Sequence, residues 1–477
     1  MVSLTPADFV IIAAYIGGVL VIGFITVRPK STSAEFLLAG RSLTVPVFVM
    51  TLVSTWYGGI LGVGEFSYRY GISNWTVQGV PYYIFALIFA LLLAKPIRRT
   101  NLATIPDKLH QAYDRKTAVF GAFLTFFLMT PAPYILMIAV LLQLITGWGM
   151  LTCTLIGTAA STIYLFFGGF RSDVNTDIFE FFLMFLGFGI ILPFAYVKFG
   201  GLDFIRQHIP PLHLTWNGGN SMQFVVVWFF IALWTLVDPS FHQRCYAAKS
   251  GEVAQKGILI SIIFWFVFDA MTATAGLYAR AVLPPLAQPV MAYPLLAEAV
   301  LPPVAKGFFY VGMLATIMST LNTLTFVSAT TLGRDIVLRL GAGTAENENR
   351  YTQWGLIVTG VFSIALAMLI PSVIKLWYTI GTVIIPGLLV PLVTSYFDRW
   401  KVPARYAFGA MVLGWFTSSL WLLIGWTQQL GASEYYPFGV EPMYPGLLMS
   451  ICVWAVGWVS VHHAAGTLPT ERQSPGF

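Results

Sequence analysis

Hydroxyl side chains recur at helical spacing inside one otherwise apolar stretch of this sequence. Four of them lie three or four positions apart and would share one face of a helix: Thr316, Ser319, Thr320 and Thr323. Asn322 stands three positions after Ser319, at the edge of that face. Hydroxyl and amide oxygens are hard donors that suit alkali and alkaline-earth cations. The pattern is compatible with cation binding, but hydroxyls that bond to a neighbouring membrane helix follow the same spacing and are frequent.

Carboxylates also lie in or beside apolar segments, where they are costly and usually functional. Asp269 stands in mid-segment, with Arg280 about three turns further on. Glu65 has Arg69 one turn along the same segment, so a simple ion pair would also explain it. Asp177 stands near the start of another segment, where the helix dipole alone would favour it. We expect Asp269 and Glu65 to titrate or to contact a bound molecule.

Two apolar segments are predicted to be broken. Gly58 and Gly59 stand in the middle of the segment 47–70. Paired glycines free backbone groups, and a membrane tolerates these where the backbone lines a cavity or is buried in protein. Close packing of small residues against another helix is the alternative. A second break is expected before Pro239, which lacks an amide donor, although an ordinary helix end explains this proline equally well.

Composition indicates that these residues belong to a membrane protein. Of the 477 residues, 57% are hydrophobic and 10% are charged, whereas a soluble domain carries about 25% charged residues. Continuous apolar runs longer than about 18 residues recur from end to end, unlike the alternating strands of a β-barrel. We therefore expect an all-α membrane protein. The net charge of +6 lies in short loops, so nucleic acid is not an expected partner.

Several function classes lack their sequence signatures. The three cysteines, Cys153, Cys245 and Cys452, show no metal-binding spacing. No GxxxxGK[ST] loop occurs, which argues against ATP-driven transport by this chain. No catalytic constellation stands at a membrane edge, so an enzyme is not expected. The short tail after the last apolar segment argues against a fused signalling domain.

Thirteen membrane-spanning helices are predicted from the apolar segments. The tracts 200–222 and 281–303, which hold prolines and charged residues, are predicted to be external loops. The expected spans are 6–28, 44–71, 75–97, 117–146, 149–169, 174–199, 223–242, 256–280, 304–333, 352–371, 373–397, 405–427 and 442–462.

The basic residues predict an orientation in the plasma membrane. With the N-terminus outside, the inward ends and loops hold 20 of the 26 Lys and Arg residues. This bias predicts an external N-terminus, a cytoplasmic C-terminus and an odd number of spans. The first span is too long for a cleavable signal peptide and lacks the charged start of one, so we expect it to remain in the mature protein.

Several short motifs stand in an order and at a spacing that are typical of one family of membrane proteins. They are residues 35–41, 168–170, 176–177, 239–244, 247–250, 318–320 and Asp335. In these motifs the chain resembles the sodium/solute symporter family, the sodium-driven carriers of proline, sugars, pantothenate and sialic acid. The stretch 56–59 departs from the proline-carrier and sugar-carrier versions, so the solute is left open. The seventh span also lacks a glycine at its expected break.

The resemblance implies a LeuT-like core of two inverted repeats with five helices each, surrounded by peripheral helices. It also implies sodium-coupled symport of a small organic solute by alternating access, carried out by a monomer in the bilayer. Sodium would be the coupling ion and not a tightly bound cofactor. The implied organisation is 1–41, first helix and cytoplasmic loop; 42–200, helices 2–6; 201–222, external loop; 223–400, helices 7–11; 401–465, helices 12 and 13; 466–477, cytoplasmic tail.

The resemblance further implies a sodium site between the second and ninth spans. Its ligands would be the carbonyl oxygens of Leu52, Thr55 and Thr316 and the hydroxyls of Ser319 and Thr320. A second sodium position or a release route would fall on Asp177, Ser319, Asn322 and Thr323.

The implied solute site lies beside the broken second span. The residues expected there are Trp56, Tyr57, Gly58 and Gly59, with Trp234 as a lid. Two other functions stay open at this point. A proton-coupled carrier on the same fold would titrate Asp177 or Asp269. A membrane solute sensor would bind its solute without moving it.

Overall fold

The regular structure of the described residues is helical, which confirms the expected fold class. One isolated parallel bridge joins Leu43 to Ala248. All but the first residue of the predicted tail 466–477 lies outside the described part of the chain. The residues that the computed structural model describes are 2–28, 32–341, 347–428 and 436–466.

The first half of the chain begins with one separate helix and continues with five further spans. Three of these spans are interrupted or change pitch within the membrane. The helices are α1 (Pro6–Ile25), α2 (Ser33–Leu38), α3 (Val45–Trp56), α4 (Ile60–Tyr70), η2 (Trp75–Gly79), α5 (Val80–Ile88), η3 (Phe89–Leu93), α6 (Ala94–Arg99), α7 (Ile105–Ala112), α8 (Arg115–Leu128), α9 (Ala132–Thr146), α10 (Met150–Thr162) and α11 (Leu165–Phe199).

The second half, like the first repeat, opens on a broken span, and long helices follow it. Its seventh span is divided into three short helices, and a break stands directly before Pro239 as predicted. The helices are α13 (Met222–Ile231), α14 (Trp234–Val237), α15 (Pro239–Ala247), α16 (Gly251–Val282), α18 (Ala305–Thr330), η6 (Thr331–Leu338), α19 (Glu348–Leu369), α20 (Val373–Thr394), α21 (Ala404–Gln428) and α22 (Met443–Gly466).

The predicted number of spans agrees with the structure once α10 is included. Among the described residues, eleven helices are long and apolar enough to cross a membrane, and the bent pair α3 and α4 makes a twelfth. The predicted span 149–169 corresponds to α10, which has 13 residues, followed by the first turn of α11. That turn ends at Gly169, whose positive φ of 55° breaks α11 close to its start.

The two long connections are more ordered than predicted. The tract 200–222 holds α12 (Leu202–His208) and η4 (Pro211–Leu214), and the tract 281–303 holds η5 (Pro289–Met291) and α17 (Ala292–Val300). The Tyr293 hydroxyl of α17 donates to the Thr272 carbonyl of α16 at 2.7 Å. Helices this short give too few turns for a periodic signal, so the sequence alone predicts loops there.

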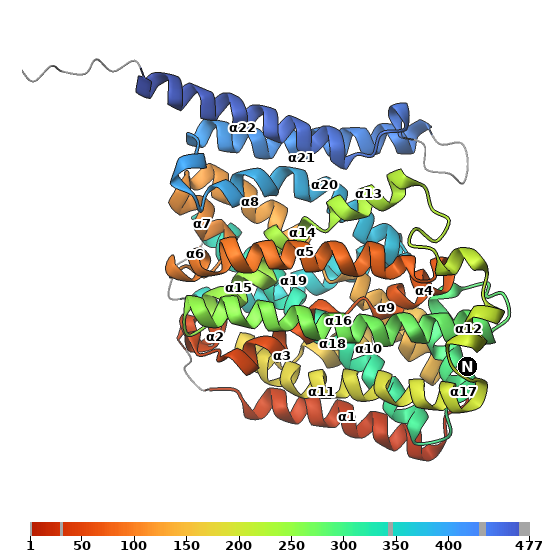
Figure 1. Ribbon diagram of the computed structural model, residues 1–477. Coiled ribbons are helices and arrows are strands. Elements are labelled where there is room, and N and C mark those ends of the chain that lie inside the picture. Colours follow the sequence, from red (N-terminus) through yellow and green to blue (C-terminus); the bar gives the residue numbers. More distant parts are fainter. Residues whose placement is uncertain (1, 29–31, 342–346, 429–435, 467–477) are drawn as a thin grey trace, which may run out of the picture.

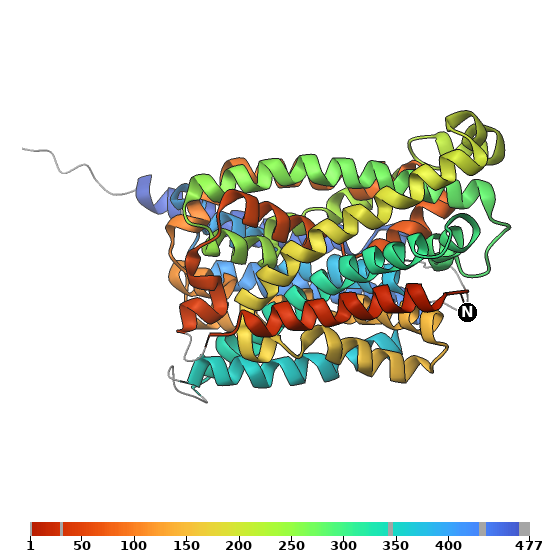
Figure 2. The ribbon, with the colours of Figure 1, turned by 90° about the horizontal axis from the view of Figure 1, so that it is seen from below.

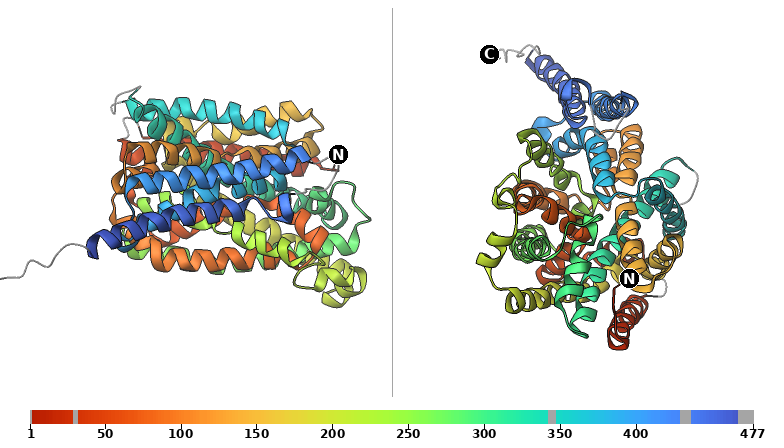
Figure 3. Two further views of the ribbon diagram at one scale, coloured as in Figure 1. Left: turned by 90° about the horizontal axis from the view of Figure 1, so that it is seen from above. Right: turned by 90° about the vertical axis from the view of Figure 1, so that its right-hand side faces the viewer.

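The spans run side by side in one bundle (Figures 1 and 2). Viewed along the bundle, α1 lies at one edge and α21 and α22 lie at the opposite edge (Figure 3). Helix α18 lies at the centre of the bundle, because its most apolar stretch of 18 residues is entirely buried. The helices that hold the hydroxyl face are therefore surrounded by protein rather than lipid.

Glycines allow α11 and α18 to cross closely at the centre of the bundle. A Cβ atom on Gly187 would lie 2.8 Å from the Gly312 Cα atom, and the reverse distance is also 2.8 Å. Small residues let helix backbones approach in this way within membranes. The crossing brings the acidic part of α11 to the hydroxyl face of α18.

Candidate functional site

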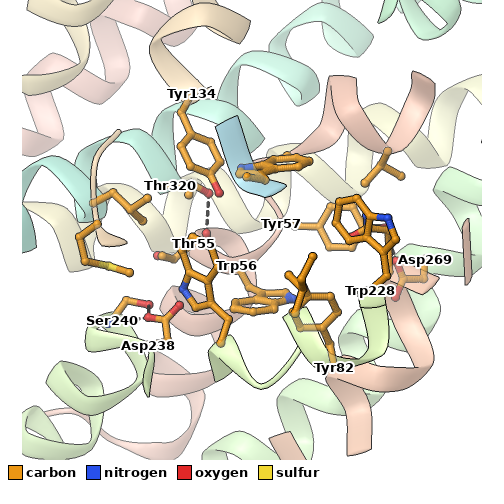
Figure 4. Close-up of a pocket in the computed structure, with 18 of the residues that line it drawn as sticks. Thr55, Trp56, Tyr57, Tyr82, Tyr134, Trp228, Asp238, Ser240, Asp269 and Thr320 are labelled. Carbon is orange, nitrogen blue, oxygen red and sulfur yellow. Dashed lines mark hydrogen bonds between the residues drawn. The ribbon is translucent and has the colours of Figure 1, made fainter. Parts of the chain in front are cut away.

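A cavity of about 120 Å³ lies beside the break between α3 and α4. The two helices meet there at an angle of 58°. Figure 4 shows the side chains that surround the cavity. The lining residues are Thr55, Trp56, Tyr57, Gly59, Val63, Gln78, Tyr82, Tyr83, Met129, Tyr134, Trp228, Ile231, Trp234, Asp238, Ser240, Asp269, Thr320, Leu324 and Trp377.

The paired glycines at the break are required by close neighbours. A Cβ atom on Gly58 would lie 2.0 Å from the Thr320 hydroxyl, and one on Gly59 would lie 2.3 Å from the Trp377 ring. Real Cβ atoms do not approach other atoms this closely, so a side chain at either position would push the partner away. The break therefore fits both interpretations of the sequence. Its backbone lines a cavity, and its glycines pack closely against neighbouring side chains.

Aromatic rings form much of the cavity wall. Trp56 packs edge-to-face with Tyr82 at 5.0 Å between ring centroids and with Phe241 at 5.3 Å. On another side, the rings of Tyr134 and Trp377 lie 6.2 Å apart. Edge-to-face and tilted aromatic pairs of this kind are favourable. The predicted solute residues Trp56, Tyr57, Gly59 and Trp234 all line the cavity, and Gly58 packs against Thr320 beside it.

Asp269 joins the cavity wall through tyrosine hydroxyls. Tyr57 donates to Asp269 Oδ1, and Tyr83 donates to Asp269 Oδ2. The Tyr57 hydroxyl also lies 2.8 Å from the Thr272 hydroxyl. Both oxygens of this carboxylate are therefore engaged, and it holds Tyr57 and Tyr83 in place.

Asp238 stands at the break between α14 and α15. Its extended backbone, with ψ of 113°, ends α14. Its Oδ1 atom then accepts from the Ser240 amide at 2.7 Å, the Ser240 hydroxyl at 2.5 Å and the Phe241 amide at 3.4 Å. Asp238 is thus the N-cap of α15, a role for which aspartate is well suited. Asp238 and Asp269 lie at opposite ends of the drawn side chains (Figure 4).

The predicted sodium ligands meet around the Thr320 hydroxyl. This hydroxyl lies 2.5 Å from the Thr55 carbonyl oxygen and 3.5 Å from the Thr316 carbonyl oxygen. Thr55 lies in the last turn of α3, next to the break, so the contact joins this end of α3 to α18. Leu52 is fully buried one turn before Thr55. The adjacent Ser319 hydroxyl instead donates to Asp177 Oδ1 at 2.5 Å.

The predicted second cation position already contains a guanidinium group. Arg244 Nη2 lies 3.0 Å from Asp177 Oδ2, 3.1 Å from the Thr323 hydroxyl and 2.5 Å from the Thr55 hydroxyl. The side chains of Arg244 and Asp177 are fully buried. Asn322 points elsewhere, since its amide donates to the Tyr164 hydroxyl. The structure therefore brings Asp177 and Thr323 together, but around a cation of the protein itself.

The other acidic candidates lie apart from the cavity. Glu65 pairs with Arg69 at 3.0 Å, the simple ion pair that the spacing allowed, and is not among the lining residues. Glu180, further along α11, accepts from the Tyr15 hydroxyl of α1 at 2.9 Å. Glu65 belongs to a pair near the protein surface, and such pairs contribute little to stability.

Two site residues have a signal that the sequence analysis did not use. Asp238 is an acidic residue inside an apolar span, which is usually functional in a membrane. Arg244 stands in a span that runs on to Ala247, so it is buried rather than at the cytoplasmic end. His242 is also buried in α15. The predicted seventh span ends at residue 242, five residues before Ala247, so the prediction places Arg244 in a loop.

The arrangement of broken helices around a cavity and a buried hydroxyl face agrees with the results of sequence comparison. A model of the sodium:solute symporter family matches residues 36–414. The chain belongs to the sodium:solute symporter family. This symporter is accordingly a multi-pass membrane protein that couples the movement of a small solute to sodium by alternating access.

The relatives of this symporter match most of its length. It is 27% identical to the sodium/pantothenate symporter of Escherichia coli over 474 residues, which cover 94% of this chain and 95% of that protein. It is 24% identical to the human high affinity choline transporter 1 over 412 residues, covering 80% and 70% of the two chains.

Solved structures establish the fold of this symporter. A Na+-coupled sialic acid symporter superposes with a TM-score of 0.77 at 15% identity, covering 97% of this chain and 98% of that one. The nucleobase-cation-symport-1 family transporter Mhp1 gives a TM-score of 0.63 at 11% identity, with 93% and 98% covered. The core is thus of the LeuT type, as the resemblance implied.

Proposed function

We propose that the coupling sodium binds between α3 and α18 and that the solute binds in the adjoining cavity. The ligands would be the carbonyl oxygens of Leu52, Thr55 and Thr316 and the hydroxyls of Ser319 and Thr320. One observation carries this proposal. Thr55 and Thr320 line the cavity and also bond to each other at 2.5 Å, so the ion site and the solute site share residues.

This shared wall supplies a physical route for coupling. Sodium between α3 and α18 would fix the end of α3, and with it Trp56 and Tyr57 in the cavity. Solute against those rings would in turn hold α3 close to α18. Each ligand then favours the state that binds the other, which is the requirement for coupled transport. Trp234 would cover the solute from the broken seventh span.

One sodium per cycle is the expected stoichiometry. The second candidate position, at Asp177, Ser319, Asn322 and Thr323, contains the Arg244 guanidinium group, which lies 3.0 Å from Asp177 and 4.0 Å from Asp173. A sodium ion there would lie about 3–4 Å from a like charge and would be repelled. Asp177 would serve the release of sodium from the first site through its bond to Ser319.

The orientation follows from the distribution of charge, and we propose an external N-terminus. Lys306 is one of the basic residues outside the predicted inward loops. It donates to the Ser3 carbonyl at 3.0 Å and pairs with Glu298 at 2.9 Å, so it lies at the N-terminal end of the bundle. The opposite end carries the basic cluster around Arg334 and Arg339. Labelling of Lys198→Cys, but not Lys401→Cys, by an impermeant thiol reagent on intact cells would support this; the reverse pattern would exclude it.

The helices at the two edges are proposed to be peripheral to the transport core. The repeats would be residues 42–200 and 223–400, joined by the tract 201–222. The first helix and residues 401–465 would flank them. The cavity is built within one chain, which favours a functional monomer.

The experiment for this proposal is uptake by purified protein in liposomes. Relatives are named for pantothenate, choline, monocarboxylates and proline, and these four solutes form the panel. An inward sodium gradient should drive uptake of at least one of them. Ser319→Ala should raise the half-saturating sodium concentration about fivefold or more, because a lost polar ligand costs roughly 1–3 kcal/mol.

Three results would count against the proposal. Uptake driven equally by a pH gradient without sodium would favour proton coupling. Binding of a solute without any transport would favour a sensor. Unchanged sodium dependence in Ser319→Ala would remove the ion from this site. Ser261→Ala is the matched control, since its buried hydroxyl bonds within α16 to the Gly257 carbonyl at 2.9 Å.

A further inference from the structure

The cavity has an unusual chemical composition for a solute site. Eight of its lining residues are aromatic and two are carboxylates. None of the lining residues in the described part of the chain is Lys, Arg or His. A site that took an anion would be expected to present a cationic side chain or free amide donors. The lining presents one neutral amide side chain, Gln78, alongside two carboxylates and aromatic rings.

Asp238 offers an oxygen atom to the cavity. Its described hydrogen bonds all use Oδ1, which caps α15. Its Oδ2 atom accepts none of the hydrogen bonds found among the described residues, although 95% of the residue is buried. The N-terminus of α15 stabilises a negative charge at this position. A buried carboxylate oxygen that faces a cavity calls for a positive partner.

Asp269 does not compete for that role. The hydroxyls of Tyr57 and Tyr83 occupy its two oxygens, so this carboxylate is already satisfied by the protein. Arg244, the cation on α15, pairs with Asp177 at 3.0 Å and lies 4.0 Å from Asp173. Asp238 is therefore the carboxylate that a bound molecule would neutralise.

The aromatic rings are suited to the same kind of ligand. Aromatic ring faces carry partial negative charge and attract organic cations within about 6 Å of the ring centroid. Trp56 and Tyr82 form a corner in which the rings are inclined at 66°. Figure 4 shows this corner between Asp238 and Asp269. A cation in the corner would meet ring faces as well as the Asp238 carboxylate.

The helix end that is best suited to an anion is covered. The N-terminus of α4 points into the break, and its amide groups would favour a carboxylate. However, the Trp377 ring lies against Gly59 and Gly62, where added Cβ atoms would approach it to 2.3 Å and 2.8 Å. The indole therefore shields the first turn of α4 from the cavity.

We propose that the solute of this symporter is a small organic cation, such as a quaternary ammonium compound, with its charge against Asp238 and the Trp56–Tyr82 corner. This inference rests on the proposed solute cavity and adds the substrate class to it. It distinguishes the solute of this chain from a carboxylate such as pantothenate, although the chain is similar in sequence to pantothenate carriers.

The test measures the melting temperature of the purified protein in sodium with four probes. Choline and tetramethylammonium are the cations, 3,3-dimethyl-1-butanol is the neutral isostere of choline, and pantothenate is the anion. At least one cation should raise the melting temperature in a saturable manner, and the isostere and pantothenate should not. Stabilisation by neither cation, or equal stabilisation by the isostere or pantothenate, would overturn the proposal.

Asp238→Asn tests the assigned residue. Asparagine caps helices as well as aspartate does, so α15 should still form. The dissociation constant of the active cation should rise at least about tenfold, as for loss of a charged partner, while sodium binding by the variant should persist. Unchanged cation affinity in this variant would contradict the role of Asp238.

The outcomes also separate this inference from the proposed function. Sodium-driven uptake of an anion in liposomes would refute the organic cation and leave the coupled carrier intact. Cation binding that is indifferent to sodium, with no sodium-driven uptake, would refute the coupled carrier at this site while retaining the substrate class.

Discussion

At the scale of single residues, the site depends on contacts that leave no space. Gly58 and Gly59 place backbone against Thr320 and Trp377, and the bond from Thr320 to the Thr55 carbonyl crosses the same break. Sequence spacing predicted the hydroxyl face, because period and residue type both lie within one helix. It could not predict which oxygen faces which partner, because Thr55 and Thr320 are 265 positions apart.

Gly59→Ala should abolish solute binding while leaving the fold largely intact. The added methyl would displace the Trp377 ring, and overpacking of this kind costs typically about 1–3 kcal/mol. The measurement is the ligand-dependent shift in melting temperature, together with the elution profile of the detergent-solubilised protein.

Gly360→Ala is the control for that variant. No atom lies within 4 Å of a Cβ at Gly360, which also stands in the middle of a transmembrane helix. It should keep full ligand response. Normal solute binding by Gly59→Ala would show that the contact between Gly59 and Trp377 does not shape the cavity.

At the scale of helices, Arg244 joins four elements. Its guanidinium group contacts Thr51 and Thr55 of α3, Asp177 of α11 and Thr323 of α18 from its own position on α15. The sequence contains these residues, yet Arg244 lies 193 positions from Thr51 and 67 from Asp177. Periodicity within one helix carries no information about such pairings, so the buried ion pair appears in the structure alone.

Arg244→Gln should destabilise the protein strongly, by roughly 3–5 kcal/mol, because it leaves a buried carboxylate without a partner. The double variant with Asp177→Asn removes that charge and should recover part of the loss. Melting temperatures of the two single variants and the double variant measure the coupling between the residues.

The same set of variants tests the expected stoichiometry of one sodium per transport cycle. If the guanidinium group occupies the second cation position, sodium should stabilise Arg244→Gln more steeply than it stabilises the wild type. An equal sodium response in the two proteins would show that no cation position has been opened.

At the scale of the whole molecule, α20 connects the transport core to the peripheral helices. The Tyr378 hydroxyl of α20 donates to Glu441 in the connection between α21 and α22. Burial raises the pKa of Glu441 to about 7. The overall topology was predictable because long apolar runs and basic loops are read one segment at a time. The contact between Tyr378 and Glu441 was not predictable, because it depends on how separate helices pack.

Glu441 should make stability depend on pH near neutrality. Its carboxyl binds a proton more tightly in the folded protein than in the unfolded chain, so stability should fall as pH rises from about 5 to 8. Glu441→Gln should flatten this slope, as measured by melting temperature across that range. A slope that is equal in the two proteins would place its origin elsewhere.

The central claim is that sodium binds between α3 and α18 in the wall that the solute also contacts. Equilibrium binding of ²²Na⁺ to the purified protein tests it most directly, with Thr320→Val as the variant and Ser261→Ala as the control. The account predicts saturable binding in the wild type and the control, and affinity at least about fivefold weaker in Thr320→Val. Wild-type affinity in Thr320→Val would contradict it.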